Sequence, residues 1–390
     1  MNARRILLEM FDAALRAVDG RACVERFLRN TDLSGQVEVI AVGKAASAMA
    51  RGAQVALGSR IDRMLVITKD GHTDPALDSS TGILQLQSAH PIPDARSFSN
   101  GIELEERVRA LRDGVLPLFL ISGGSSSLVE ALRDGASLDD VLALNVHGLA
   151  SGWDIARLNL ERARLSRIKG GGIARLLGGR RALALFISDV PGDDPDVIGS
   201  GLLGRDAGIA DGIERHVIAT VETAVSAVQE AAHANGLELA AVPARFDGDV
   251  VAVAEECLAR LRATAADGLV WGGESTVKLP AEHGRGGRNT HLALTFARQL
   301  RAADPWLLLA AGTDGTDGPT VDAGAIVDAG TLERATLGGC DVERAWREFD
   351  SGTALEAAED LVHTGPTGTN VGDILIAIRQ SSTSCSNLAE

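Results

Sequence analysis

Short apolar runs alternate with amphipathic segments along the first half of the chain. The apolar runs are residues 37–42, 64–68, 84–87, 116–121 and 182–187. Each run has the length of a buried β-strand. Between them, residues 45–57, 95–111 and 138–149 have helical spacing, and the last of these starts after Ser137 as an N-cap. This alternation predicts an α/β domain with a mainly parallel sheet and right-handed crossovers.

A second α/β set follows Asn235-Gly236. An alanine-rich stretch from about residue 214 to 234 predicts one long helix before that point. Beyond it, the pattern predicts helices at 249–265 and 290–300 and strands at 269–271, 306–310 and 374–378. We therefore expect domains at residues 1–236 and 237–380, followed by a polar, frayed tail at 381–390. No low-complexity linker separates the two domains, so we expect a shared cleft, which is the default place for a ligand.

Composition excludes several classes of function. The chain has 390 residues, 45% of them hydrophobic, and a formal charge of −15, which would repel a nucleic-acid backbone. Four cysteines without C-x-x-C spacing favour neither a disulfide framework nor a zinc site and fit a reducing cytoplasm. No run approaches the roughly 20 apolar residues of a membrane span, and the N-terminal segment has an amphipathic pattern rather than that of a signal peptide. These features predict a cytoplasmic protein with small-molecule partners.

Two loops in the second half place acidic residues among glycines. One is Gly272–Thr276, which contains Glu274, and the other is Ala311–Gly318, which contains Asp314 and Asp317. Strand-like runs lead into both loops, and α/β proteins bind ligands at such strand ends. Glycines let backbone N–H groups approach a ligand closely, while carboxylates suit a hard cation. The two loops predict a site for a phosphate and a metal ion.

A lysine follows the first strand at the beginning of the first crossover helix. There, Lys44 comes directly after Gly43, where free N–H groups and the helix dipole favour an anion. The position suits a lysine that contacts a transferring phosphoryl group, but it also suits a solvated lysine on a helix shoulder. The segment is not a Walker A loop, because position 38 is Glu and Ala45 replaces Ser or Thr.

A glycine- and serine-rich turn follows the strand at 116–121. Hydroxyl and amide groups together at such a turn predict an oxyanion cradle, whereas a simple N-capped helix would explain only one serine. The turn lacks the G-x-S-x-G form of a hydrolase nucleophile elbow. Its candidate binding residues are Ser122, Gly123, Gly124, Ser125 and Ser126.

Two further turns carry candidate polar groups. The rigid Pro91-Ile92-Pro93 turn is placed to aim His90 and Asp94 at a ligand, although Asp94 also fits a plain N-cap. Asp189 follows the strand at 182–187, where α/β enzymes keep catalytic carboxylates.

A glycine-rich segment and an arginine complete the candidates. Lys169 opens a triple-glycine segment that fits either a mobile loop over the site or a flexible connector. Arg288 begins the helix at 290–300, where its planar fork can hold a carboxylate or a phosphate. No G-x-G-x-x-G follows any strand, which disfavours nicotinamide chemistry. The remaining histidines, His291 among them, lack metal-ligand spacing and are interpreted as ordinary core or surface residues.

In order along the chain, nine segments resemble those of the glycerate 2-kinase family. The segments are residues 42–46, 88–94, 122–127, 165–171, 189–194, 273–274, 286–289, 313–318 and 367–370. The resemblance implies an N-terminal Rossmann-like three-layer α/β/α domain, a C-terminal MOFRL-type domain with a mixed sheet, and an active site in the interdomain cleft. It also implies transfer of the γ-phosphoryl of ATP to the 2-hydroxyl of D-glycerate, with Mg²⁺ or another divalent cation. Some members have been labelled hydroxypyruvate reductases, so an NAD(P)H-dependent reductase is the alternative enzyme.

The chain departs from the family pattern at two places. Thr290-His291 stands where the family usually has Gln-Glu, and Gly372 stands where it usually has Asn. Because both departures lie beside predicted site residues, another small hydroxy acid is an alternative acceptor.

The resemblance gives each candidate a role. Lys44 would neutralise the transferring phosphoryl, Asp189 would accept the acceptor's proton, and Arg288 would hold the acceptor carboxylate or a phosphate. Glu274 with Asp314 or Asp317 would position the metal. The matching segments add Lys169, Asn289, Thr313 and Asn370 to the binding residues. A non-catalytic nucleotide sensor is the alternative outside enzymes, and the oligomeric state, a homodimer included, stays open.

Overall fold

The chain forms two compact α/β units. The computed structural model describes residues 3–77, 82–151, 155–206, 208, 210–280 and 282–380. One unit, here called the parallel-sheet unit, comprises residues 18–220 and 368–371. The other, the mixed-sheet unit, comprises residues 1–17, 221–367 and 372–390.

The parallel-sheet unit is a doubly wound Rossmann-like domain. Its strands are β1 (Val37–Val42), β2 (Ile61–Lys69), β3 (Ile83–Ser88), β4 (Leu116–Ile121), β5 (Ala182–Ile187) and β6 (Ile213–Ala219). They lie in the order β3-β2-β1-β4-β5-β6, and every neighbouring pair is parallel. This order reverses direction between β1 and β4, which makes the carboxyl ends of these two strands the expected ligand crevice.

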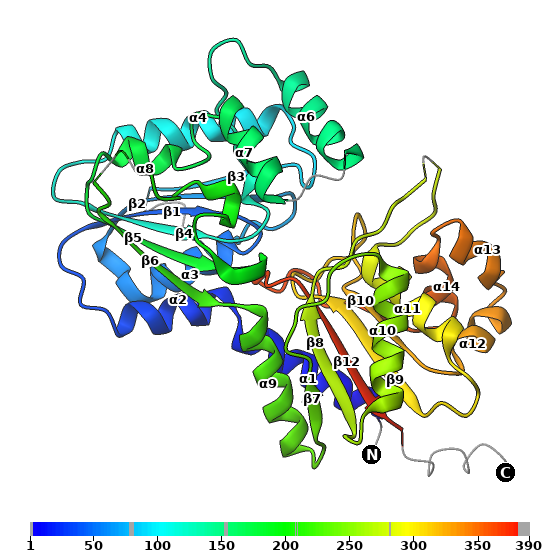
Figure 1. The fold of residues 1–390 in the computed structure, drawn as a ribbon. Coiled ribbons are helices and arrows are strands. Elements are labelled where there is room, and N and C mark those ends of the chain that lie inside the picture. Colours follow the sequence, from blue (N-terminus) through cyan, green and yellow to red (C-terminus); the bar gives the residue numbers. More distant parts are fainter. Residues whose placement is uncertain are drawn as a thin grey trace. The chain divides into compact units, whose positions relative to one another are not determined.

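Helices cover both faces of the parallel sheet. They are α2 (Gly20–Arg29), α3 (Ala46–Leu57), α4 (Ala95–Arg109), α5 (Ser125–Leu128), α6 (Leu138–Ala150), α7 (Ile155–Leu165) and α8 (Gly172–Leu177). In Figure 1, α2 and α3 lie on one face of this sheet, and α4 and α8 lie on the other. Every residue of β1 and β5 is therefore buried, which explains why these strands are continuous apolar runs.

The mixed-sheet unit is built around an antiparallel central strand. Its strands are β7 (Leu239–Ala241), β8 (Gly268–Gly273), β9 (Trp306–Gly312), β10 (Gly324–Val327), β11 (Leu361–Val362) and β12 (Asp373–Arg379). They lie in the order β11-β10-β9-β12-β8-β7, and β12 runs antiparallel to both β8 and β9. The start of β12 therefore lies beside the ends of β8 and β9.

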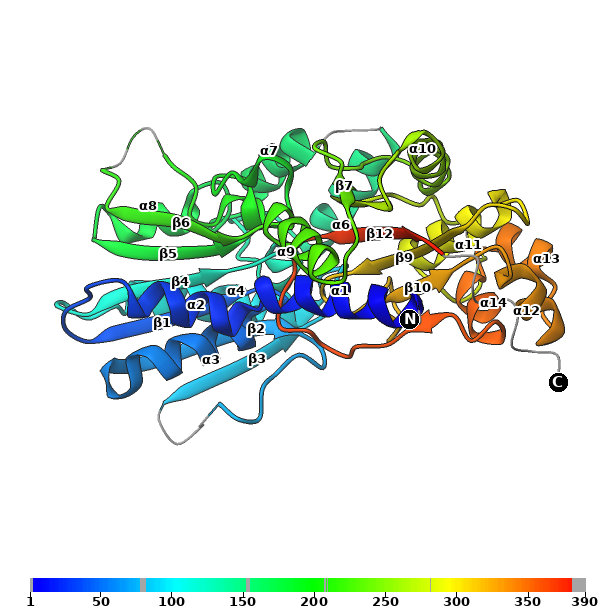
Figure 2. The ribbon, with the colours of Figure 1, turned by 90° about the horizontal axis from the view of Figure 1, so that it is seen from below.

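Two layers of helices flank the mixed sheet. The helices are α1 (Ala3–Ala17), α9 (Val221–Ala234), α10 (Val250–Ala263), α11 (Arg288–Gln299), α12 (Thr331–Leu337), α13 (Val342–Arg347) and α14 (Ser351–Ala357). Helices α1 and α9 pack together beside the sheet, as Figures 1 and 2 both show. Helix α11 packs on β9 and β10 and against α10 and α14. Phe246, Phe296 and Trp271 belong to the apolar core that results.

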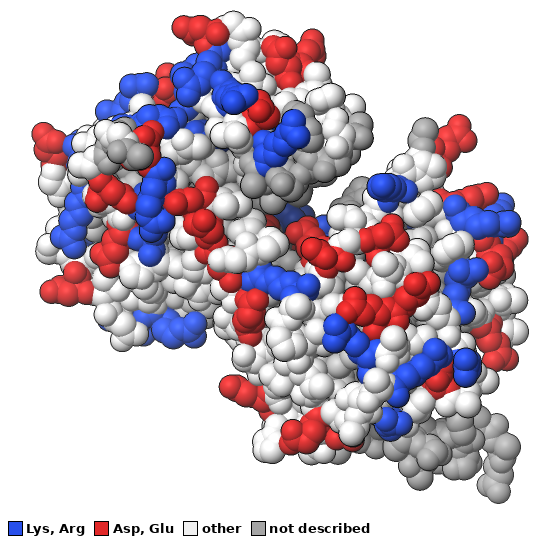
Figure 3. Space-filling model, in the orientation of Figure 1, with Lys and Arg blue, Asp and Glu red and all other residues white. Residues whose placement is uncertain are grey.

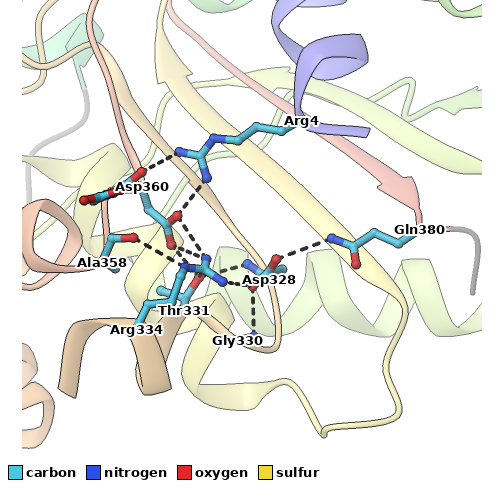
Figure 4. Close-up of polar contacts among 9 residues, drawn as sticks. Arg4, Asp328, Gly330, Thr331, Arg334, Ala358, Asp360 and Gln380 are labelled. Atoms are coloured by element: carbon cyan, nitrogen blue, oxygen red, sulfur yellow. Dashed lines mark hydrogen bonds and ion pairs between the residues drawn. The ribbon is translucent and has the colours of Figure 1, made fainter. Parts of the chain in front are cut away.

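An ion-pair network attaches the N-terminal helix to the mixed-sheet unit. Arg4 of α1 donates to the carboxylate of Asp360 at 2.7 Å, a contact drawn in Figure 4. Arg4 also donates to the carbonyl of Glu359 at 3.0 Å. Asp360 is buried, and its second partner, Arg334, donates to both of its oxygens and also to Asp328. Together with the packing of α1 on α9 and β12, these contacts hold α1 in the mixed-sheet unit.

The structure confirms most of the predicted elements and differs at one. The α/β class, the mainly parallel first sheet and the Ser137–Asp140 helix start are as predicted, with Asp140 N–H donating to Ser137 Oγ at 3.2 Å. The single long helix predicted at 214–234 is wrong, because residues 213–219 form edge strand β6 and only 221–234 are helical. Only Ala219 of β6 is buried, as suits an edge strand that is partly exposed.

The predicted domain boundary at residue 236 stays a prediction, and the compact units group the elements as follows. Both α1 and α9 pack with the mixed-sheet unit, and residues 368–371 pack with the parallel-sheet unit. The predicted tail at 381–390 lies outside the described residues.

The surface carries charges of both signs. On the face drawn in Figure 3, acidic and basic side chains are interspersed over both units. Among the described helices, none combines the length and the apolar character that crossing a membrane would require.

Candidate functional site

The loops after β1 and β4 are joined at the switch point of the parallel sheet. The backbone N–H of Lys44 donates to the carbonyl of Gly123 at 3.0 Å, and that of Ala45 donates to Ser122 Oγ at 3.0 Å. Gly43 has a φ of 133°, and a side chain there would overlap Ser122. Only glycine allows this close approach, which places Lys44 beside the serine-rich turn.

The glycine pair of the serine-rich turn lies between the candidate catalytic groups. A side chain on Gly123 would overlap Asp189 and Asn370, and Asn370 Nδ2 donates to Asp189 Oδ2 at 2.7 Å. On Gly124, which has a φ of 81°, a Cβ would lie 3.0 Å from Lys44 Cγ and 3.1 Å from the His90 ring. The fold therefore brings Lys44, His90, Asp189 and Asn370 around two residues without side chains.

The serines of this turn have different surroundings. Ser122 and Ser125 are fully buried. Ser126 Oγ lies 2.6 Å from Ser200 Oγ, which in turn donates to Asn159 Oδ1 at 2.9 Å. Of the predicted cradle, Ser126 is therefore the serine hydroxyl that reaches a cavity.

A cavity of about 180 Å³ opens beside Gly124. Its lining residues are His90, Pro91, Pro93, Gly124, Ser126, Ser127, Val141, Arg162 and Lys169. Lys169 and Glu130 form an ion pair at 2.5 Å in its wall, and the two side chains are only 3% and 2% exposed. Burial lowers the pKa of Lys169, while the adjacent Glu130 carboxylate opposes that shift.

Two predicted features near this cavity have clear structural roles. Asp94 is the N-cap of α4 and accepts from the backbone N–H of Arg96 at 2.9 Å, which is the plain alternative considered for it. The glycines after Lys169 are held by hydrogen bonds from Gly170 N–H to Ser200 and from Gly171 N–H to Gly201.

In the mixed-sheet unit, Arg288 lies within a cluster of acids. Its Nε and Nη2 donate to the two carboxylate oxygens of Asp373 at 2.6 and 3.0 Å, and its Nη1 donates to Glu274 at 2.5 Å. Burial by itself would lower the pKa of Arg288, but Asp373 and Glu274 raise it above its ordinary value. Burial raises the pKa of Asp373 to about 6, against the opposing effect of Arg288.

Two further acids lie close to this pair. A Cβ on Gly312 would lie 3.4 Å from Asp314 Oδ1 and 3.5 Å from Asp373 Oδ1, so these carboxylates approach the same point. Asp317 uses both oxygens to accept the backbone N–H groups of Asn289 and Thr290, at 2.9 and 2.7 Å. Asp317 therefore fixes the start of α11, the helix on which Arg288 stands.

The acid cluster has the oxygen donors that a hard cation requires. Asn289 Oδ1 is buried and has no hydrogen-bond partner among the described residues. Glu274 is half exposed, and Asp314 approaches the same cluster. Within the described part of the chain, no group of three or more His, Cys, Asp or Glu could hold a metal unaided. Mg²⁺ commonly takes one or two carboxylates and completes its shell with waters and substrate phosphates, so these residues fit it.

The side chain of His291 points into the core and away from the acid cluster. Its Nδ1 lies 2.7 Å from Ser351 Oγ, and its ring stacks on Phe349 and Trp346 with centroid separations of 4.5 and 5.9 Å. It is 3% exposed, as expected of an ordinary core histidine. The departure at position 291 therefore lies in the packing between α11 and the start of α14.

Sequence reasoning missed three charged residues at these sites. Asp373 lies directly before the predicted strand at 374–378, but its place beside β8 and β9 depends on the antiparallel direction of β12. Glu130 follows α5, which ends at Leu128, and no motif in the sequence marks it. Arg162 lies on α7, and no signal in the sequence distinguishes it from other helix arginines.

Comparisons with known proteins agree with this architecture. The model for a domain of unknown function, DUF4147, matches residues 6–232, and the MOFRL family model matches residues 268–373. A D-glycerate 2-kinase of Thermotoga maritima is 32% identical over 97% of this chain and 98% of its own length. A glycerate 2-kinase of Pyrococcus horikoshii is 30% identical over 97% of this chain and 98% of its own.

Two other comparisons extend this result. A protein of Agrobacterium vitis with the provisional name hydroxypyruvate reductase is 36% identical over 96% of this chain and 94% of its own length. The crystal structure of a glycerate kinase from Thermotoga maritima matches with a TM-score of 0.82 and 31% identity, covering 96% of this chain and 99% of that one.

Proposed function

Because the chain belongs to the family that joins a DUF4147 domain to a MOFRL domain, we propose that it is a glycerate 2-kinase. It would transfer the γ-phosphoryl group of ATP to the 2-hydroxyl of D-glycerate and release 2-phosphoglycerate and ADP. The observation that carries this proposal is the arrangement of Lys44 and Asp189 on either side of the Gly123–Gly124 turn.

Asp189 is suited to orient the acceptor hydroxyl. In the reaction, the hydroxyl oxygen forms a bond to the γ-phosphorus, the bond from that phosphorus to the β–γ bridging oxygen breaks, and the hydroxyl proton passes to Asp189. A carboxylate suffices as base because the transition state is loose and deprotonation comes late. The hydrogen bond from Asn370 fixes the orientation of the Asp189 carboxylate beside Gly123.

Lys44 is suited to stabilise the transferring group. Charge spreads over the equatorial oxygens of the phosphoryl in the transition state, and preorganised positive charge lowers that barrier. Lys44 is half-buried, and its backbone N–H donates to the carbonyl of Gly123. The backbone position from which the ammonium group extends is therefore fixed.

The acid cluster would hold the divalent cation and position the phosphates. Glu274, Asp314 and Asn289 would supply oxygen ligands to Mg²⁺, which would neutralise phosphate charge when bound. Arg288 already uses three of its N–H groups on Asp373 and Glu274, so we assign its other two to a phosphate oxygen.

The experiment is incubation of the protein with Mg-ATP and D-glycerate, followed by ³¹P NMR of the product. We expect one new phosphate on the carbon-2 oxygen, with ADP formed in equal amount. A product phosphorylated on carbon 3 would overturn the regiochemistry, and no phosphorylated acid with any C3 or C4 sugar acid would overturn the kinase.

The reductase alternative has its own direct test. Mixing the protein with hydroxypyruvate and NADH or NADPH should leave the absorbance at 340 nm unchanged. The turn after β1 lacks the glycine fingerprint that brings a dinucleotide pyrophosphate close to the backbone. A steady loss of absorbance that depends on the protein would favour the reductase.

A further inference from the structure

Another cavity, of about 220 Å³, lies within the mixed-sheet unit. The start of α10, the side of α11 and the end of α13 enclose it, since Val251, His291 and Trp346 are among its lining residues. No step of the proposed reaction uses these residues. A dry cavity of about 150 Å³ already accommodates benzene, so this one has room for a single aromatic ring with a small substituent.

Three aromatic rings line this cavity. The rings of Trp346 and Phe349 lie at 14° and 24° to the plane of His291, with centroid separations of 5.9 and 4.5 Å. Nearly parallel rings offer flat surfaces to a planar ligand, and contacts between aromatic rings stabilise a complex beyond the area that they bury. The lining therefore favours a planar ring over an aliphatic group of similar size.

Phe349 holds its ring in this wall with a strained backbone. It lies two residues beyond the end of α13 and has a φ of 54°, in the left-handed region that usually takes glycine after a helix. Strained residues of this kind are found where a side chain has a role at a ligand site. Here the side chain stacks on His291 and completes the aromatic wall.

His291 is the most buried polar group of the lining, with 3% of its surface exposed. Its Nδ1 lies 2.7 Å from Ser351 Oγ, whereas its Nε2 has no hydrogen-bond partner among the described residues. Burial lowers the pKa of His291 to about 4, so the ring is neutral at pH 7 and carries one N–H. When the Ser351 hydroxyl donates to Nδ1, that proton lies on Nε2, which can then donate to an acceptor in the cavity.

The charged side chains of the lining have a positive balance. Lys278 and Arg347 line the cavity together with one acid, Asp249. Within the described part of the chain, Lys278 makes no hydrogen bond or ion pair. Arg347 donates through Nε to the carbonyl of Glu343 at 3.3 Å, and the Glu343 carboxylate is paired with Arg298 at 2.7 Å.

The start of α10 adds to the positive potential. Asp249 caps this helix and accepts the backbone N–H of Val251 at 2.9 Å, so part of its charge is already compensated. A helix of 14 residues carries partial positive charge at its N-terminal end. The combination of two cations, a helix N-terminus and a neutral imidazole N–H therefore suits an anion.

We propose that this cavity binds a small aromatic carboxylate that takes no part in phosphoryl transfer. The ring of the ligand would lie against Trp346 and Phe349. One carboxylate oxygen would accept from His291 Nε2, and the other would face Lys278 and Arg347. The proposal does not depend on the kinase function, because all of these groups belong to the mixed-sheet unit and none is assigned to the reaction.

Calorimetry of the full chain with benzoate, in the absence of nucleotide, tests the proposal. The parent should bind one benzoate with a dissociation constant below about 1 mM. Benzamide has the same ring without the charge and should bind about 3- to 10-fold more weakly. Cyclohexanecarboxylate keeps the charge without the planar ring and should bind about 2- to 10-fold more weakly. A parent protein that does not bind benzoate at about 10 mM would overturn the proposal.

The role of the cations is tested by Arg347→Gln against Arg344→Gln on the same helix. Arg344 is 66% exposed, lies 3.9 Å from Glu348 and is not part of the lining, so it is a matched control. Arg347→Gln should raise the dissociation constant of benzoate about 3- to 10-fold, because one charged contact at an exposed position is lost. Arg344→Gln should stay within about twofold of the parent, and equal effects of the two changes would contradict the assignment of Arg347.

A second pair of variants tests the cavity itself. Val251→Phe would fill the space and should abolish benzoate binding, whereas Val321→Phe, at a position that is 74% exposed in the same unit, should not. Circular dichroism and thermal unfolding establish that each variant is folded. Parent-like benzoate binding by a folded Val251→Phe would place the ligand elsewhere. If that variant does not fold, the comparison of Arg347→Gln with Arg344→Gln decides.

Competition with ATP separates this proposal from the proposed function. Saturating Mg-ATP should leave the dissociation constant of benzoate within about twofold. If ATP displaces benzoate competitively, the cavity belongs to the nucleotide and the proposal is wrong, whatever the kinase activity. If benzoate binds as described but no acid is phosphorylated, the proposed function fails and the cavity assignment stands.

Discussion

Arg288 and Asp373 form a two-point ion pair at the edge of the mixed sheet. The Nε–Asp373 and Nη2–Asp373 distances are 2.6 and 3.0 Å, and Asp373 is 1% exposed. A bidentate pair fixes the plane of the guanidinium as well as its position. Asp373 is therefore a positioning residue for Arg288, and this pair can be tested against a similar pair nearby.

We expect Asp373→Asn to lower kcat by about 10- to 100-fold, because Arg288 loses its orienting charge. Stability should fall by about 1–3 kcal/mol, since a partly buried charge loses its ionic partner. Steady-state kinetics and thermal unfolding measure the two effects. The control is Asp322→Asn, because Arg285 donates to both oxygens of buried Asp322 at 3.1 and 2.9 Å. That variant should lose similar stability and keep its kcat, and an equal loss of kcat would remove the positioning role from Asp373.

Lys44→Ala should reduce kcat by about 10²–10³, by analogy with removal of one preorganised donor from an oxyanion hole. The fold should be retained, because the backbone bond from Lys44 to Gly123 does not depend on the side chain. Circular dichroism and steady-state kinetics check both statements. Lys278→Ala, at an exposed position of the mixed-sheet unit, should behave like the parent. Parent-like turnover by Lys44→Ala would remove Lys44 from the reaction.

Gly123→Ala should abolish most activity through a steric effect. The added methyl group would overlap Asp189 and Asn370, so the hydrogen bond between them could not keep its geometry. We expect kcat to fall by at least about 100-fold, in line with the cost of misplacing a reacting group by about 1 Å. In Gly208→Ala, the methyl would make an ordinary contact 3.5 Å from Asp206 and should leave kcat unchanged. An active Gly123→Ala would show that Asp189 need not lie against this turn.

Stability should depend on pH through His291. Burial lowers its pKa from 6.5 to about 4. Below pH 6.5, His291 therefore binds a proton in the unfolded chain, whereas in the folded protein it binds one only below about pH 4. The free energy of unfolding therefore falls as the pH falls through this window. The contribution is about 2–3 kcal/mol between pH 6.5 and 4.5, at about 1.4 kcal/mol for each pH unit.

Urea unfolding at pH 7 and pH 4.5 measures this contribution. Other groups also titrate in the same window, so His291→Gln is the matched comparison: it removes the titration and keeps a polar partner for Ser351. The variant should lose less stability than the parent over the same interval. Equal losses in the two proteins would mean that His291 can take up a proton in the folded state.

Much of the parallel-sheet unit could be predicted from local sequence. Strands such as 116–121 are continuous apolar runs because helices cover both faces of a parallel sheet, and their turns carry glycine and serine for local reasons. Parallel strands place all their carboxyl ends at one edge. Lys44, the serine-rich turn and Asp189 could therefore be named as neighbours without any knowledge of packing.

Other features of both units were less accessible to the same reasoning. Edge strand β6 was mistaken for a helix because an exposed strand carries a weak apolar signal. Asp373 was missed because the residues of a strand do not indicate its direction in the sheet. Only the antiparallel pairing of β12 places Asp373 opposite Gly273 and Gly312. Arg162 likewise has no local signature, since only the fold buries it near Glu130 and Lys169.

The sequence by itself determined the α/β class, the strand-end turns and the chemistry available there, because periodicity and turn composition are local properties. Only the tertiary structure decided which charges are paired. Arg288 was predicted to hold the acceptor carboxylate or a phosphate, yet Asp373 occupies its Nε–Nη2 edge and Glu274 accepts from its Nη1. Ion pairs between residues as far apart in sequence as Arg288 and Asp373 depend on distances that only chain folding sets.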